Sequence, residues 1–518
     1  MPSSGEVKRP VVRAQRFGQR ADGWLTQLLW FVATVSVCLL FAVALRRLGY
    51  PFEVEWMEGA MVDHVRVVLG GEPLYRAPSV GHTPLLYTPL YHYLGAAFAA
   101  VFGVSFTVLR AISILATAGS VALIGWIVWR ETDSRLAAVV AAGLFTATYG
   151  LTGFWLDIVR ADALCLVFVL GAVATARFGR STLAHLATAV LLFLAFFTKQ
   201  TALPLALGPL AFLIARDWRR GLGAALGYVV LVAGAVAWLD ARSGGWFTFY
   251  VIELGASHPL LWDRWVSLLI DFFWNPVAVA VLLAMLAFVG PALASKGRAV
   301  WAFYLLLCLT AAGSAYLALL HKDGFVNVLI PAYAVLSLVV GPSLAWVLAQ
   351  QERMDPARGA TLGLFTKLAL LLAFGVLAYE PRRALPTEQD GPACQAIIQA
   401  LRDQPGEILV LGTGYYGAVA GHPEIHAHAM ALVDVLKGDD ERVRGRLLAE
   451  LLESLRSRRF SAVVTGRALS LLPPEVGQEL MRSYRRDREL LPPEAWPHCR
   501  PRVGFPHRPE QLWVALPE

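Results

Sequence analysis

The residues best suited to chemistry lie in one polar stretch, residues 55–93, which separates two apolar segments. The stretch carries three acids close together, Glu55, Glu58 and Asp63. Carboxylates are costly inside hydrocarbon, so an acid-rich loop between apolar segments is expected at a water interface. A carboxylate held there can act as a general base toward a hydroxyl group. Glu58 precedes Gly59 near the start of a predicted helix, and it is the residue most favoured for this role.

The acids belong to a predicted short amphipathic helix that lies along the membrane. Glu55, Glu58 and residues 61–62 share one face at helical spacing, and an apolar stripe continues along residues 65–69. Gly70–Gly71 is expected to end the helix. The alternative is that the acids are only the solvated face of this helix.

Further charged side chains at segment ends are predicted to bind substrate. Cations at these positions can hold a lipid phosphate or pyrophosphate through charge-assisted hydrogen bonds. The residues considered are Asp157, Arg160, Asp162, Lys199, His321 and Lys322. A structural ion cluster explains the first three equally well, and an interfacial lysine that snorkels to water explains Lys199.

Two histidines in separate loops suggest a metal. His82 and His258 could each ligate a divalent cation beside a carboxylate, but interfacial hydrogen bonding is the preferred explanation of both. No cofactor follows with certainty from these residues, and a divalent metal stays a possibility.

Membrane spans must position these residues, because the chain is strongly apolar. Of its 518 residues 57% are hydrophobic and 16% are charged, against about 25% charged in soluble domains, and its mean hydropathy is +0.56. About 20 apolar residues cross a bilayer core. The apolar runs are residues 24–48, 85–102, 106–129, 137–155, 161–178, 183–197, 202–215, 221–239, 268–293, 299–319, 325–348 and 362–379. They predict an all-α polytopic membrane domain over residues 24–379, with about 11–12 transmembrane helices.

Basic residues predict the orientation of these spans. The net charge of +7 comes from Lys and Arg at segment ends, as the positive-inside rule expects, and does not indicate nucleic-acid binding. Residues 1–23 form a basic tail that is expected in the cytoplasm, before an uncleaved first span. The first loop (49–84), the second large loop (241–270) and residues 380–518 are then expected outside a cytoplasmic or inner membrane.

The number of crossings is odd between the first loop and Asp157, although both are expected outside. Three apolar segments lie in this interval, so one of them is predicted not to cross fully. Residues 85–102 are chosen, because Pro84 and Pro89 bracket their start and the first turns are rich in tyrosine. About eleven crossings remain, and an error in the orientation is the competing explanation.

Residues 380–518 are charged and proline-rich, and they predict a small α/β domain. Strands are expected at 407–412, 461–465 and 511–516, and a charged helix at 439–458. The glycine-rich GTGYYG lacks the dinucleotide-binding pattern and a helix start after it. Cys394 and Cys499 could pair in an oxidising compartment, which leaves their state open. A further cluster, His422, His426 and His428, could bind metal, but a loop that covers the acceptor site is preferred.

The order of several motifs resembles the GT-C superfamily of polyprenyl-phosphate-dependent glycosyltransferases. The resemblance is to the bacterial relatives of protein O-mannosyltransferases and to the lipid A aminoarabinose transferases, and it covers most of residues 24–348. The motifs are WMEG, GGEPLY, HTPLLYTPLYHY, LDIVRAD, FFTKQTALP and HKDGFVNVLIP. One departure stands out. Many relatives have a catalytic Asp directly before the Glu, and this chain has Met57 there, so the base is either Glu58 or Glu55.

The resemblance implies a reaction and partners. A carboxylate would deprotonate an acceptor hydroxyl, which attacks the anomeric carbon of a sugar on a polyprenyl phosphate with inversion. The partners would be the lipid-linked donor, a lipid, glycan or protein acceptor, and the bilayer. A carboxylate near the position of His82 and a histidine in the later loop, as His258, hold metal in some relatives.

Two other readings compete with an enzyme. A lipid-linked transporter would place polar groups near the bilayer midplane and show internal repeats. Here the polar groups gather on the predicted outer face, and no convincing repeat is found. An inactive scaffold of the same fold is the third reading, because of Met57.

Overall fold

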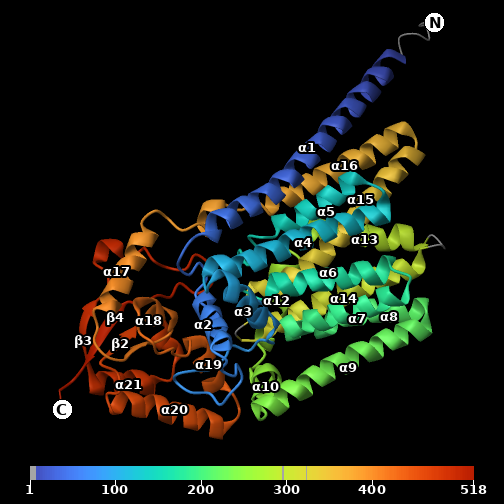
Figure 1. The fold of residues 1–518 in the computed structure, drawn as a ribbon. Coiled ribbons are helices and arrows are strands. Elements are labelled where there is room, and N and C mark those ends of the chain that lie inside the picture. The colour runs from blue at the N-terminus through green and yellow to red at the C-terminus, as the bar shows by residue number, and fades with distance from the viewer. Residues whose placement is uncertain (1–7, 294–296, 323, 518) are drawn as a thin grey trace.

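The computed structural model describes residues 8–293, 297–322 and 324–517. Asp323, within the motif HKDGFVNVLIP, lies outside these residues. Helices make up most of residues 8–376, and the start of α1 and the C-terminal sheet lie at opposite ends of the molecule (Figure 1). The longer helices of this part are α1 (Lys8–Leu48), α2 (Glu58–Leu69), α3 (Leu90–Phe102), α4 (Phe106–Thr132), α5 (Arg135–Ala147), α6 (Asp162–Phe178), α7 (Thr182–Thr198), α8 (Leu207–Arg216), α9 (Trp218–Ser243), α12 (Trp265–Phe273), α13 (Ala278–Leu293), α14 (Arg298–Leu320), α15 (Ile330–Arg353) and α16 (Pro356–Val376). Short helical turns connect them: η1 (Gln200–Ala206), α10 (Trp246–Thr248), the π-helix η2 (Phe249–Glu253), α11 (Leu254–Ser257), η3 (Trp262–Arg264) and η4 (Val326–Leu329).

Six helices in the described part of the chain are long and apolar enough to cross a membrane. They are Asp22–Leu48, Phe106–Thr132, Trp218–Ser243, Arg298–Leu320, Val326–Arg353 and Pro356–Val376. A bent pair, Trp262–Phe273 and Ala278–Leu286, makes a seventh if it acts as one span. Four more apolar helices are shorter: Leu90–Phe102, Arg135–Ala147, Thr182–Thr198 and Gln200–Arg216. The predicted all-α polytopic domain is therefore confirmed.

Two predicted apolar segments are interrupted in the structure. Residues 268–293 do not form one helix, because the chain bends by 76° between α12 and α13. Pro276 lies in this break, where it lacks an N–H group and disfavours a helical conformation for the residue before it. Residues 137–155 are helical only to Ala147. The turn after it includes Gly153 and Phe154 with φ of 69° and 59°, which a right-handed helix cannot accommodate.

Helix α3 corresponds to the segment predicted not to cross. Its 13 residues span about 20 Å at about 1.5 Å per residue, less than the roughly 30 Å of a hydrocarbon core. Helix α5 also has 13 residues. The lengths of α3 and α5 therefore agree with the prediction that one segment between the first loop and Asp157 does not fully cross the membrane. The number of crossings itself stays a prediction.

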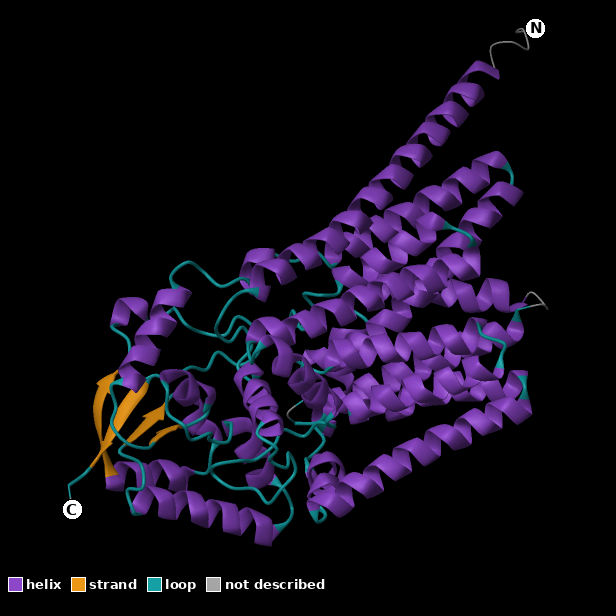
Figure 2. Ribbon diagram, viewed as in Figure 1, coloured by secondary structure: helices purple, strands orange, loops and turns teal. Residues whose placement is uncertain are grey.

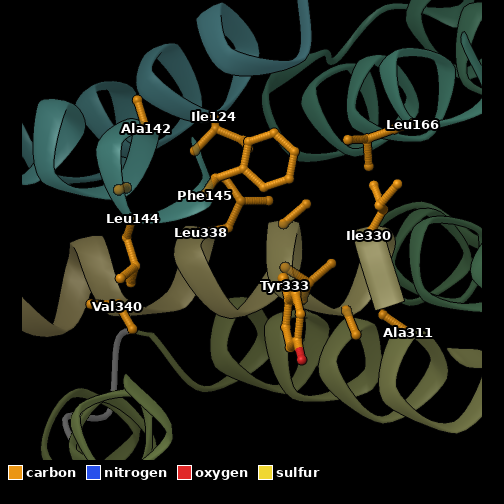
Figure 3. Close-up of a cluster of buried hydrophobic side chains, with 14 of the residues drawn as sticks. Ile124, Ala142, Leu144, Phe145, Leu166, Ala311, Ile330, Tyr333, Leu338 and Val340 are labelled. Carbon is orange, nitrogen blue, oxygen red and sulfur yellow. The ribbon is translucent and has the colours of Figure 1, made fainter. Parts of the chain in front are cut away.

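Helix α15 is the centre of the bundle. Within its apolar window 78% of residues are buried, against 17–44% in the other five single spans. Its Tyr333, Leu338 and Ile330 face side chains of neighbouring helices, among them Phe145 of α5 and Ala311 of α14 (Figure 3). A helix that is apolar on all sides suits this position, because every face packs against another helix.

The C-terminal part is a small α/β domain, as predicted, with its strands gathered at one end of the molecule (Figure 2). The sheet order is β1-β2-β4-β3, with β1 and β2 parallel and the other pairs antiparallel. The strands are β1 (Ile408–Val410), β2 (Ala462–Thr465), β3 (Tyr484–Glu489) and β4 (Gln511–Ala515). The helices are η5 (Pro381–Ala384), α17 (Asp390–Arg402), α18 (Tyr415–Ala420), α19 (Ala429–Lys437), α20 (Glu441–Arg456), η6 (Arg467–Leu471), α21 (Pro474–Ser483) and η7 (Pro493–Ala495).

Two elements of this domain differ from the sequence analysis. Strand β3 was not expected, because its sequence YRRDRE is mostly charged and exposed. It is an edge strand, where charged side chains discourage pairing with other molecules. The expectation of no helix start after GTGYYG is also wrong, since α18 begins within it at Tyr415.

Candidate active site

The polar loop before α2 lies between the helix bundle and the C-terminal domain (Figure 1). Helix α2 begins at Glu58 and is capped by Gly70, and Gly71 follows with φ of 76°, so the predicted end is confirmed. Glu55 precedes the helix rather than sharing its face. Nine of the twelve residues of α2 are buried, including Glu58 and Asp63. The alternative that these acids form a solvated face is therefore wrong.

Both carboxylate oxygens of Glu58 are fully engaged. Oε1 accepts from Arg110 Nε at 2.9 Å and from the Val159 amide at 2.8 Å. Oε2 accepts from Arg110 Nη2 at 2.6 Å and from the amides of Val54 and Glu55 at 2.7 and 3.3 Å. Burial alone would raise the pKa of Glu58, but Arg110 and the amide donors bring it below its ordinary value. These contacts keep Glu58 ionised and hold three separate chain segments together.

Arg110 completes this clamp from helix α4. Its guanidinium also donates to the carbonyls of Arg47, Tyr50 and Phe52 at 3.0, 2.6 and 2.7 Å. Arg110 and Glu58 are both fully buried. The pair therefore fixes the path of the loop that leads from α1 into α2.

Glu55 is buried but only partly engaged. Its Oε2 accepts from the Met57 amide at 3.2 Å and lies 3.7 Å from Arg160 Nη1, whereas Oε1 has no hydrogen-bond partner. Burial raises the pKa of Glu55 to about 7; Arg160 opposes the rise and Glu58 adds to it. A carboxylate with a free oxygen and a pKa near neutrality is suited to take a proton.

A chain of polar side chains extends from Glu55 into the bundle. Arg160 donates to the Tyr87 hydroxyl, and its guanidinium carbon lies 5.1 Å from the centre of the Tyr87 ring. Lys199 Nζ lies 5.9 Å from the centre of the same ring. Asp162 Oδ1 accepts from Lys199 Nζ at 2.6 Å and from Asn327 Nδ2 at 2.8 Å. We call Glu55, Tyr87, Arg160, Asp162, Lys199 and Asn327 the polar cluster.

The polar cluster contains several buried polar atoms without a hydrogen-bond partner. They are Glu55 Oε1, Arg160 Nε and Nη1, and Asp162 Oδ2. Such groups are rare in folded proteins, because each one left unpaired is costly. The carboxylate oxygens of Glu55 and Asp162 can accept hydrogen bonds from ligand hydroxyl groups. The two Arg160 nitrogens can donate hydrogen bonds to anionic oxygens of the same ligand.

A further acid, Glu53, was missed by the sequence analysis. It is buried, and its Oε1 accepts from the Gly59 amide at 2.9 Å. A Cβ on Gly59 would lie 2.4 Å from this oxygen and 2.6 Å from Tyr415 Cβ, so only glycine fits. The signal was its place two residues before Glu55. Burial raises the pKa of Glu53 well above its ordinary value, so it is expected to be protonated.

Two of the predicted acids bond outside the polar cluster. Asp157 Oδ1 accepts from Arg47 Nη1 at 3.1 Å and from the Tyr149 hydroxyl, which ties α1 to the turn after α5. Asp63 accepts from Arg66 at 2.7 Å, and burial raises its pKa to about 7 against the charge of Arg66. The ion-cluster interpretation therefore fits Asp157, and Arg160 and Asp162 belong to the polar cluster.

The histidines considered for metal bond to backbone carbonyls. His82 Nε2 lies 2.8 Å from Leu74 O, and His258 Nε2 lies 3.3 Å from Asp434 O. Across the described ranges, no group of three or more His, Cys, Asp or Glu side chains is arranged to hold a metal ion. His321 pairs with Leu260, and the Lys322 amide donates to Pro259 O, so this motif also contacts the second large loop.

A strap from the C-terminal domain, residues 499–507, lies against Glu55. The amides of Arg502 and Val503 donate to Val54 O at 2.8 and 3.0 Å. A Cβ on Gly504 would lie 3.1 Å from Glu55 Oε1. From the same domain, His428 Nε2 bonds to Trp56 O at 3.0 Å. The domain thus covers the loop that carries Glu55.

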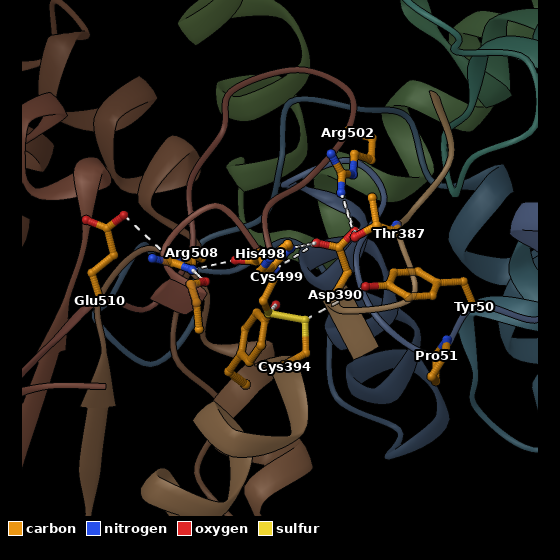
Figure 4. The surroundings of a disulfide bond; sticks show 12 residues. Tyr50, Pro51, Thr387, Asp390, Cys394, His498, Cys499, Arg502, Arg508 and Glu510 are labelled. Atoms are coloured by element: carbon orange, nitrogen blue, oxygen red, sulfur yellow. Dashed lines mark hydrogen bonds and ion pairs between the residues drawn. A yellow bond between two sulfur atoms is a disulfide. The ribbon is translucent and has the colours of Figure 1, made fainter. Parts of the chain in front are cut away.

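The strap is anchored by a disulfide bond between Cys394 and Cys499, which were left open in the sequence analysis. Asp390 accepts from the Cys499 amide at 3.0 Å and from the Arg502 guanidinium (Figure 4). Asp390 and Cys394 both belong to α17. One helix therefore holds the start and the middle of the strap.

Removing the disulfide is expected to destabilise the C-terminal domain and weaken the site. The bond joins residues 105 apart in sequence, and loss of such a cross-link costs about 2–5 kcal/mol. The Cys394→Ser/Cys499→Ser variant should unfold at lower temperature than the parent protein. Mild reduction of the parent should reproduce the shift, and reduction of the variant should add nothing to it. An unchanged unfolding temperature would show that the bond does not anchor the strap.

Comparison with known proteins identifies the fold. No family model and no curated protein matches the chain. Among solved structures it is similar to ArnT from Cupriavidus metallidurans bound to undecaprenyl phosphate, with a TM-score of 0.54, 11% identity and coverage of 95% of this chain and 100% of that one. The apo state of the same protein has a TM-score of 0.54 and 13% identity, with coverage of 94% of this chain and 100% of that one. This chain has the GT-C fold. An oligosaccharyltransferase from Archaeoglobus fulgidus, solved with Zn and sulfate, has a TM-score of 0.48 at 13% identity, over 88% of this chain and 71% of that one.

Within the GT-C fold, the motifs noted in the sequence meet at the polar cluster. LDIVRAD supplies Arg160 and Asp162, FFTKQTALP supplies Lys199, and Glu55 directly precedes WMEG. Tyr87 and Asn327 were missed as site residues. Both lie inside noted motifs, HTPLLYTPLYHY and HKDGFVNVLIP, which was the available signal.

Proposed function

We propose that this protein is a membrane glycosyltransferase that transfers a sugar from a polyprenyl-phosphate donor to an acceptor hydroxyl at the outer face of the cytoplasmic membrane. The observation that carries the proposal is the set of unpaired buried polar atoms on Glu55, Arg160 and Asp162. The GT-C fold supports the same reaction class, and the related ArnT structure holds undecaprenyl phosphate.

In this reaction Glu55 is the general base. Its free Oε1 takes the proton of the acceptor hydroxyl while the hydroxyl oxygen bonds to the anomeric carbon. The bond from that carbon to the phosphate oxygen breaks with inversion, and polyprenyl phosphate leaves with the electron pair. Arg160, whose Nε and Nη1 have no hydrogen-bond partner, stabilises the departing phosphate. Lys199, which lies on the Tyr87 ring as Arg160 does, adds a second positive charge.

Glu58 supports the reaction without contacting the reactants in this proposal. Both its oxygens are already used by Arg110 and backbone amides, one of which is the amide of Glu55. It therefore positions the base. Many members of the GT-C superfamily carry an Asp at the position of Met57. In this chain the acid nearest to Met57 that has a carboxylate oxygen without a hydrogen-bond partner is Glu55.

The orientation of the chain is part of the proposal. Residues 1–23 are placed in the cytoplasm, and the loops 49–84 and 241–270 and the domain 380–518 outside. Two observations support it. The N-terminal end of α1 points away from the C-terminal domain (Figure 1), and that domain contains a disulfide bond, which persists in oxidising compartments.

The test is turnover of defined donors. Full-length protein in lipid is incubated with a panel of polyprenyl-phosphate sugars and an acceptor extract, and free polyprenyl phosphate is measured. Release that depends on both sugar and acceptor supports the transferase. Movement of intact donor across the bilayer without release would instead favour a transporter, and neither result would favour a scaffold.

The rate should depend on pH through Glu55. Its pKa is about 7, and only the ionised carboxylate can accept a proton, so kcat/KM should rise with pH and level off above about 7. Below that value the rate should fall about tenfold per pH unit. The donor is a phosphodiester and does not titrate in this range. A flat profile between about pH 5.5 and 8 would remove Glu55 from the role of base.

A further inference from the structure

Helices α4, α6 and α8 end on the side of the helix bundle away from the C-terminal domain (Figure 1), and a polar pocket lies among residues at these ends. Its volume is about 280 Å³. The lining residues are Arg130, Arg177, Phe178, Arg180, Phe212 and Arg216. Four arginines and two phenylalanines, without an acid among them, make this an anion-attracting site.

Only one of the four arginines has its charge neutralised. Arg177 donates to Glu131 at 2.8 Å, and the Tyr304 hydroxyl donates to the same carboxylate at 2.8 Å. Among the residues that the structure describes, Arg130, Arg180 and Arg216 form no ion pair within 4.0 Å. Arg130, Arg180 and Arg216 are exposed, so solvent weakens the repulsion between their charges, and an anion bound among them would reduce it further.

Specific contacts hold three of the four arginines of the pocket in place, although Arg130 and Arg216 are exposed. Arg216 Nη1 donates to the carbonyls of Ala176 and Arg177 at 3.3 Å each, which fixes it at the end of α6. The guanidinium carbons of Arg130 and Arg177 lie 5.8 and 5.2 Å from the centre of the Phe178 ring. By contrast, the nearby Arg220 pairs with Asp217 at 3.5 Å. The positive-inside rule explains why basic residues occur at this end of the helices. It does not explain why four of them line the same pocket.

The surroundings place the pocket at the level of lipid headgroups. Trp126 and Trp129 of α4 are each 41% exposed and lie within about one helical turn before Arg130. Exposed tryptophans mark the boundary between hydrocarbon and headgroups. Ile214 of α8 is 36% exposed beside Arg216, so apolar surface continues along the helices next to the charges.

We propose that this pocket binds a phosphate-bearing headgroup, foremost that of an acidic phospholipid. Arginine pairs with phosphate through two parallel N–H···O bonds, and three unpaired arginines suit a group with more than one anionic oxygen. The pocket volume of about 280 Å³ is close to the lower limit of small-molecule sites, roughly 300 Å³. A pocket of this size can hold a lipid headgroup but not the acyl chains, which would stay in the bilayer. This site is separate from the polar cluster and does not depend on the proposed function.

The test compares two triple variants of the full-length protein in neutral detergent. One replaces Arg130, Arg180 and Arg216 by Gln. The matched control replaces three exposed arginines that do not line the pocket, Arg135, Arg353 and Arg358, by Gln. Thermal unfolding is followed while phosphatidylglycerol, cardiolipin, phosphatidylcholine or inorganic phosphate is added.

The acidic phospholipids are expected to raise the unfolding temperature of the parent and the control, and phosphatidylcholine is not. The apparent Kd in the pocket variant should be at least tenfold weaker. The single variant Arg180→Gln, which loses no side-chain hydrogen bond seen in the structure, should weaken binding about three- to tenfold even if the triple variant folds poorly.

Equal loss of binding in the pocket and control variants would overturn the proposal, because it would reduce the effect to general surface charge. The absence of any shift with acidic lipid or phosphate in the parent would also overturn it. Protection by inorganic phosphate alone, lost in the pocket variant, would support the phosphate site and assign it to a soluble phosphate compound.

Discussion

Replacing Glu55 by Gln is expected to lower sugar transfer by about 10²–10⁴-fold, the usual contribution of a general base. Gln keeps the shape of the side chain and an oxygen for the Met57 amide, but it cannot take a proton. Because Glu55 Oε1 has no hydrogen-bond partner, the change removes no bond at that atom. The measurement is the initial rate of polyprenyl-phosphate release, with donor affinity determined in parallel.

The controls for this prediction are folding and donor binding. Both should stay close to those of the parent protein, since Arg160 and Lys199 are untouched. Glu55→Asp should retain part of the rate, because a carboxylate is still present one methylene further from the acceptor. A Glu55→Gln enzyme with more than about a third of the parent rate would exclude Glu55 as the base.

Replacing Arg110 by Leu is expected to destabilise the protein by about 3–5 kcal/mol, the cost of breaking a buried ion pair from one side. The change leaves the fully buried Glu58 carboxylate without its cation. It also removes the side-chain donor to three backbone carbonyls, those of Arg47, Tyr50 and Phe52. The measurement is thermal or denaturant unfolding of the purified protein in the same detergent.

A matched substitution at an exposed arginine serves as the control. Arg135→Leu, at the exposed start of α5, should change stability by less than about 0.5 kcal/mol. Both substitutions remove one positive charge, but only Arg110→Leu breaks a buried ion pair. The comparison therefore separates the loss of that pair from a general change of charge. Equal stability of the Arg110→Leu and Arg135→Leu proteins would contradict the structural role of the Glu58–Arg110 pair.

Much of the fold was predictable, because membrane burial imposes a strong sequence signal. Long apolar runs gave the polytopic domain, and the change of composition near Glu380 gave the C-terminal domain. The exceptions have local causes. Pro276 breaks a run that hydropathy treats as continuous, and the turn at Gly153 and Phe154 ends α5 inside another. Charged β3 was missed because an edge strand lacks the alternating apolar pattern.

The site was predictable only in part, because spacing identifies polar residues but not their partners. Sequence analysis named Glu55 and Glu58 together as bases, and it favoured Glu58. Glu58 differs from Glu55 because it pairs with Arg110, which lies 52 residues after Glu58 within an apolar span. The sequence around Glu58 does not indicate that contact. Asp157 and Asp162 likewise look equivalent in LDIVRAD, yet one bonds to Arg47 and the other to Lys199.

The most direct test of the account is the rate of sugar transfer per folded molecule in Glu55→Gln and Glu58→Gln, measured with one active donor in the same lipid. The account predicts a loss of at least about a hundredfold for Glu55→Gln at unchanged stability. For Glu58→Gln it predicts a lower yield of folded protein, with a smaller loss of rate per folded molecule. The reverse order, with Glu58→Gln stable and inactive and Glu55→Gln active, would contradict the assignment of Glu55 as the base.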